Sequence, residues 1–82
     1  MTYKYQEIWN TIKRDLKADV VVGPELAPTL IQGVKRTKCA ENATRSMMGQ
    51  IPYSKLKIRQ ETLSQTTGAI KVSFELIYDN RI

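Results

Sequence analysis

The chain has no histidine and a single cysteine, Cys39, among its 82 residues. Zinc sites of the finger, ribbon and hydrolase kinds therefore lack their usual ligands, and nucleophilic mechanisms that use a histidine base lack that base. One cysteine cannot form a disulfide within the chain. The acidic residues are scattered singly along the sequence. We therefore expect no catalytic residues, no metal site, no cofactor and no enzyme activity.

Long apolar runs are also missing. No segment approaches the roughly 18 apolar residues of a membrane span. Residues 1–17 are charged throughout, unlike a secretory signal peptide. We expect a cytoplasmic protein with no membrane partner, because a single reduced cysteine suits that compartment.

The composition is that of a folded domain: hydrophobic residues make up 41% and charged residues 26%. The length allows one small domain, residues 1–82. A chain this short buries only about 60–65% of its unfolded surface. Because no disulfide or metal supplements the core, we expect that the chain can form a homo-oligomer such as a homodimer.

The first half of the chain predicts a helix, two short strands and a second helix. Residues 3–17 are amphipathic, with apolar residues at helical spacing: Tyr5, Ile8, Trp9, Ile12 and Leu16. Residues 20–22 predict a strand, ended by a Gly-Pro pair, and residues 29–34 predict a second strand that pairs with it. Residues 35–48 predict the second helix. Its packing face would consist of Cys39, Ala40, Ala43 and Met47.

Residues 54–62 and 69–78 alternate between apolar and polar side chains, which predicts two half-buried strands joined by a turn. Their register follows from charge. If Leu63 faces Ala69, two pairs of opposite charge form across the outer face, Lys57 with Glu75 and Glu61 with Lys71. Closing the hairpin by a further two-residue step would place Arg59 opposite Lys71, which is repulsive. We expect the first register.

These elements predict an α+β domain with a three- to four-stranded, mainly antiparallel sheet packed by two helices. The element order is α-β-(β)-α-β-β, where the bracketed strand is residues 29–34, and the chain ends in a β-hairpin. Such an order occurs in many small modules and implies no function by itself.

The chain has a net charge of +5, so surfaces rich in lysine and arginine are candidate binding sites. On the second predicted helix, four polar residues share one face at spacings i, i+3, i+7 and i+10. They form the helix stripe: Lys35, Lys38, Asn42 and Arg45. The three cations suit phosphate contacts, and the amide of Asn42 suits a base edge. The alternative is the ordinary solvated face of a helix.

A second basic set, the strand group, consists of Lys55, Lys57 and Arg59. It could support phosphate contacts, or it could serve only to pair carboxylates across the hairpin and to protect the strand edge. Tyr53 is the aromatic residue best placed for exposure. Because no paired aromatics alternate on a basic strand, a sheet that stacks RNA bases is not expected.

The sequence therefore predicts a non-catalytic module that binds nucleic acid, DNA or RNA, through its basic second helix with support from the strand group. The alternative is a small protein-binding adaptor or inhibitor that docks on an acidic surface of a partner protein. Net charge does not separate these two classes.

Overall fold

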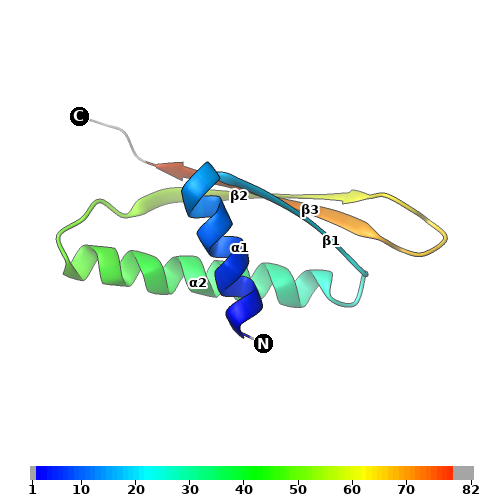
Figure 1. Ribbon diagram of the computed structural model, residues 1–82, viewed down its shortest axis with the longest axis horizontal. Coiled ribbons are helices and arrows are strands. Elements are labelled where there is room, and N and C mark those ends of the chain that lie inside the picture. The colour runs from blue at the N-terminus through cyan, green and yellow to red at the C-terminus, as the bar shows by residue number, and fades with distance from the viewer. Residues whose placement is uncertain (1, 79–82) are drawn as a thin grey trace.

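The computed structural model describes residues 2–78, which form two helices and three strands (Figure 1). The elements are α1 (Thr2–Asp15), β1 (Lys17–Val22), α2 (Ala27–Met47), β2 (Tyr53–Thr62) and β3 (Ile70–Tyr78). The strands make one antiparallel sheet in the order β1-β3-β2, so β3 lies in the centre. Both helices lie on the same side of the sheet, and the opposite face of the sheet is open. The α+β class is confirmed.

Helix α1 follows the predicted periodicity. Trp9 and Ile12 are fully buried, and Ile8 packs against them. The helix ends at Asp15. Leu16, which the apolar periodicity assigns to the helix, instead has a φ of +64° and turns the chain directly into β1. The predicted strand at residues 20–22 is confirmed and begins earlier, at Lys17.

The strand predicted for residues 29–34 is wrong, and with it the fourth strand of the sheet. Helix α2 begins at Ala27 and runs through this segment. Pro28 lies in its first turn, where the missing N–H leaves no hydrogen bond unmade. A short apolar run does not distinguish a strand from a buried helical segment. Here Ala27, Leu30 and Val34 are buried at helical spacing.

The earlier start of α2 also changes which face of the helix packs against the sheet. The buried side of the helix is defined by Ala27, Leu30 and Val34. Asn42 and Arg45 lie on this same side, because they continue the helical spacing of the three buried residues. The predicted packing face of Cys39, Ala40, Ala43 and Met47 is exposed instead. The expectation that these small residues contact the sheet is therefore wrong.

The register of the hairpin is as predicted. Lys57 lies opposite Glu75 and Glu61 opposite Lys71. The Leu63 N–H donates to the carbonyl of Ala69 at 2.8 Å. A bulge between Tyr53 and Lys55 interrupts the start of β2.

The core lies between the helices and the covered face of the sheet. Its largest fully buried side chains are Trp9, Phe74, Ile12, Leu76, Val34 and Val72. Tyr53 is also part of this core, with 4% of its surface exposed. The expectation that Tyr53 is exposed is wrong, because α2 packs over the start of β2. Among residues 2–78, no helix has the length and apolar character needed to cross a membrane.

Candidate functional site

The uncovered side of the sheet carries most of the polar side chains of the strands. We call this surface the open face. Its residues are Lys17, Asp19 and Val21 of β1, Lys55, Lys57, Arg59 and Glu61 of β2, and Lys71, Ser73, Glu75 and Ile77 of β3. They share one face because side chains of a strand alternate. Five are cations and three are anions, which gives a net charge of +2.

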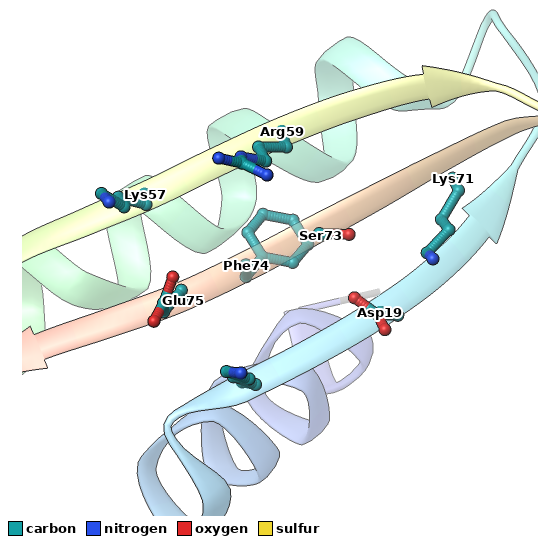
Figure 2. Close-up of a pocket in the computed structure, with 8 residues that line it drawn as sticks. Asp19, Lys57, Arg59, Lys71, Ser73, Phe74 and Glu75 are labelled. Atoms are coloured by element: carbon teal, nitrogen blue, oxygen red, sulfur yellow. The ribbon is translucent and has the colours of Figure 1, made fainter.

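The strand register arranges these side chains in rows across the sheet. Three rows run from β1 through β3 to β2: Lys17–Glu75–Lys57, Asp19–Ser73–Arg59 and Val21–Lys71–Glu61. Figure 2 shows Glu75 and Ser73 on the central strand, with Lys57 and Arg59 beside them on β2 and Asp19 on β1. On the central strand, two lysines thus flank the carboxylate of Glu75, and an aspartate and an arginine flank the hydroxyl of Ser73.

The open face has a shallow hollow of about 300 Å³, lined in part by Lys17, Lys57, Arg59 and Lys71. Among the described side chains, those of residues 5–78, the ion pairs closer than 4.0 Å are Lys13–Glu41 and Arg14–Asp15, which do not involve the open face. Lys57 and Glu75 are therefore neighbours in register without forming a close ion pair. The cations of the open face are free to meet another partner.

The helix stripe lies on α2 and does not belong to the open face. The Asn42 side chain donates from Nδ2 to the Tyr53 carbonyl at 3.1 Å, and Asn42 Oδ1 accepts from the Tyr53 N–H at 2.9 Å. Both ends of the amide are engaged with the backbone of β2. The side chain thus ties α2 to the first residue of that strand and has no free end for a base.

Arg45 is engaged at the same point. Its Nε donates to the carbonyl of Ile51 at 2.8 Å, and its guanidinium carbon lies 4.5 Å from the centre of the Tyr53 ring. The Tyr53 ring also contacts Trp9 edge-on, with centroids 5.3 Å apart, and Tyr78 at 5.1 Å. Burial raises the pKa of the Tyr53 hydroxyl above its ordinary value, and the positive charge of Arg45 opposes that rise.

Lys35 is exposed and Lys38 is half-buried, and both lie on α2. Helix α2 lies on the covered side of the sheet (Figure 1), whereas the strand group lies on the open face. One flat ligand surface does not contact both.

The strand group is predicted from the sequence, whereas two further cations of the open face, Lys17 and Lys71, are not among the predicted site residues. Alternation already placed Lys71 on the outer face of the hairpin. Lys17 would have followed from extending the β1 alternation back through Asp19. The order β1-β3-β2, which brings them together, depends on pairing between distant segments.

Compared with models of protein families, with curated proteins and with solved structures, the chain gives no match. Residues 2–78 hold no group of three or more histidine, cysteine, aspartate or glutamate side chains placed to bind a metal ion. The geometry of the open face is therefore the feature from which a function can be inferred. Its ammonium and guanidinium groups are donors of charge-assisted hydrogen bonds to anions such as phosphate.

Proposed function

We propose that the protein is a non-catalytic nucleic-acid-binding module that contacts phosphates through its open face. One observation carries the proposal: five cations share this exposed face, and none has a carboxylate within 4.0 Å among the described residues. Cations without close partners keep their charge for phosphates, and binding releases the counterions held by the nucleic acid. The strand group supplies three of the five. Asn42 and Arg45 of the helix stripe are left out, because both are engaged with the backbone.

The proposal gives a measurable salt dependence. If about four or five cations each neutralise one phosphate, the logarithm of the binding constant falls with the logarithm of salt concentration at a slope of about −4. Fluorescence anisotropy of labelled double-stranded DNA, single-stranded DNA and RNA, titrated with the full chain at several salt concentrations, measures this slope. A slope near zero for all three would contradict the proposal.

Matched variants locate the contact. Lys57→Ala and Arg59→Ala should each reduce the magnitude of the slope by about one. Lys35→Ala makes the same change of charge on the opposite side of the molecule and should leave the slope unchanged. If Lys35→Ala weakened binding as much as Lys57→Ala, the contact would lie on α2 instead of the open face.

The three carboxylates among the five cations support a second candidate function, a protein-binding adaptor or inhibitor. Mixed charge fits a partner protein whose surface presents both signs with an acidic excess. Binding to none of the nucleic acids at low salt, together with capture of one defined protein by the wild type and loss of that capture in Lys57→Ala, would favour this candidate.

A further inference from the structure

Strand β2 lies at an edge of the sheet and turns a row of backbone groups outward. The Leu63 N–H donates to the Ala69 carbonyl, so these two residues form a hydrogen-bonded pair of the antiparallel ladder. Such pairs alternate along the ladder, and the residues between them turn their N–H and C=O groups away from β3: Leu56, Ile58, Gln60 and Thr62. At the start of the strand, Asn42 engages the backbone of Tyr53. Within the described residues, no hydrogen bond reaches the outward groups of residues 56–62.

The far end of this edge is exposed. Gln60 and Thr62 alternate onto the helix side of the sheet, yet both are exposed, and the β2–β3 turn projects beyond the start of α2 (Figure 1). Proteins commonly protect an edge strand with a proline, a bulge or a covering element. Within the described chain, residues 56–62 have no proline, and the bulge of β2 precedes them. This edge is therefore able to pair with another strand, and β2 has ten residues against the six of β1.

The charges of β2 favour a second copy of the same strand in one register. In antiparallel pairing, outward residues face outward residues. When Gln60 faces Gln60, Arg59 of each copy lies opposite Glu61 of the other, and Lys57 lies opposite the apolar Leu63. A shift by one step in either direction brings like charges together. Arg59 meets Arg59 when Ile58 faces Gln60, and Glu61 meets Glu61 when Thr62 faces Gln60.

We infer that two copies of the chain pair antiparallel through β2, about a twofold axis at Gln60, and form one continuous sheet. At the axis Gln60 exchanges two backbone hydrogen bonds with Gln60 of the second copy, and Ile58 exchanges two with Thr62 in each direction. The pairs of Arg59 with Glu61 stabilise this register. The interface uses the same surface on both copies and therefore closes at a dimer. The inference does not depend on the proposed function.

The dimer is compatible with phosphate binding by the open face. Because the axis is perpendicular to the sheet, the open faces of the two copies lie on the same side. The guanidinium of Arg59 has five N–H donors, so pairing with a carboxylate leaves donors for a phosphate. Lys57 lies opposite Leu63 across the junction and keeps its charge free. The dimer therefore presents two open faces side by side.

Disulfide crosslinking of the full chain tests the partner and the register together. Each cysteine variant is made in a Cys39→Ser background, because Cys39 is exposed. At the axis the two Cα atoms of residue 60 lie about 5.5 Å apart, as in a hydrogen-bonded pair, a separation that suits a disulfide. Under mild oxidation, Gln60→Cys should form a linked dimer at least tenfold faster than Thr62→Cys.

Thr62→Cys is the matched control for Gln60→Cys. Both residues are exposed and lie on the same side of the same strand. In the proposed register the two copies of Thr62 are offset by four residues, or about 13 Å along the strand. A disulfide does not bridge that distance.

A charge exchange tests the side-chain pairs, with sedimentation equilibrium as the measurement. The wild type should show a reversible equilibrium between monomer and dimer. Arg59→Glu places two carboxylates opposite each other at both pairs and should raise the dissociation constant about tenfold, and Glu61→Arg should do the same with two guanidinium groups. The double variant, Arg59→Glu with Glu61→Arg, restores opposite charges at the wild-type net charge and should return the dissociation constant to near its original value. Circular-dichroism melts confirm that each variant is folded.

Two kinds of result would overturn the inference. One is a wild type that stays monomeric at every concentration. The other is a dimer that uses a different surface, shown by equal crosslinking of Gln60→Cys and Thr62→Cys or by a dissociation constant that Arg59→Glu leaves unchanged. Because neither measurement includes nucleic acid, both results leave the proposed function in place.

Discussion

At the residue scale, the side-chain amide of Asn42 connects α2 to the first residue of β2. Its two hydrogen bonds occupy both backbone groups of Tyr53, a residue with 4% of its surface exposed. In Asn42→Ala, the Tyr53 N–H and C=O lose these partners in a place that water barely reaches. We expect the free energy of unfolding to fall by about 1–3 kcal/mol, measured by urea denaturation.

Asn10→Ala is the matched control for this substitution. Asn10 lies on the exposed side of α1, where its Oδ1 accepts one hydrogen bond from Gln6. Its removal should change the free energy of unfolding by no more than about 0.5 kcal/mol. Equal losses in the two variants would show that the Asn42 bridge contributes nothing specific.

Tyr53 makes the free energy of unfolding depend on pH in the alkaline range. Burial raises the pKa of its hydroxyl in the folded state, so the folded protein holds this proton more tightly than the unfolded chain does. The resulting stability is fully present below the unfolded pKa of about 10 and is lost as pH rises through the folded pKa. In Tyr53→Phe, stability should fall less between neutral pH and the alkaline range. Urea midpoints that decline in parallel for the two proteins would contradict this.

At the scale of elements, the crossing of α1 over α2 depends on Gly33. A Cβ at this position would come within 2.6 Å of the Tyr5 ring, at the atoms nearest the Tyr5 backbone. Alanine improves helix propensity by about 1 kcal/mol, but rotation of the ring alone does not relieve a contact at these atoms, so α1 itself has to shift. We expect Gly33→Ala to lower the free energy of unfolding by about 1–3 kcal/mol in net terms.

A double-mutant cycle tests the cause of that loss. In a Tyr5→Ala background the ring is absent, so Gly33→Ala should become stabilising through helix propensity alone. Thermal unfolding of the four proteins measures the sign in each background. A substitution that destabilises equally with and without the ring would exclude this contact as the reason for glycine.

The elements also show what the sequence can predict. The hairpin register followed from cross-strand charges, because only one of the two registers paired Lys57 with Glu75. Helix α1 followed from a clear period of 3.6 residues. The predicted start of α2 is wrong, because Pro28 fits either a turn or a first helical turn, and Ile31 and Val34 suit a strand as well as a helix.

The start of α2 also determines which residues belong to the candidate site. With α2 starting at Lys35, small residues such as Ala43 define its buried face and Asn42 points outward. With α2 starting at Ala27, Leu30 and Val34 define the buried face, and Asn42 turns toward the sheet. The strand group was predicted, because alternation within one strand is a local signal. The sheet order that adds Lys17 depends on pairing between distant segments, which no local pattern encodes.

At the scale of the whole molecule, the described part is long and thin. Its extents are 48 × 27 × 17 Å, and its radius of gyration is 13.8 Å, against about 12 Å for a compact domain of this length. The β2–β3 turn projects beyond the start of α2 (Figure 1). Gln60, Thr62 and Leu63 are accordingly exposed. The homodimer stays a prediction, which sedimentation equilibrium would test.

This shape predicts uneven local stability. The central strand β3 pairs with both neighbours, and Val72, Phe74 and Leu76 are buried beneath the helices. Their amides should exchange with solvent only when the whole molecule unfolds, while amides at residues 62–69 should exchange through local opening and at least tenfold faster. Native-state hydrogen exchange measures both. Because Lys71, Ser73 and Glu75 of the open face alternate with these buried residues on β3, slow exchange there would mean that a ligand meets a preformed, rigid surface. Protection of the turn equal to that of β3 would contradict an uncovered hairpin in solution.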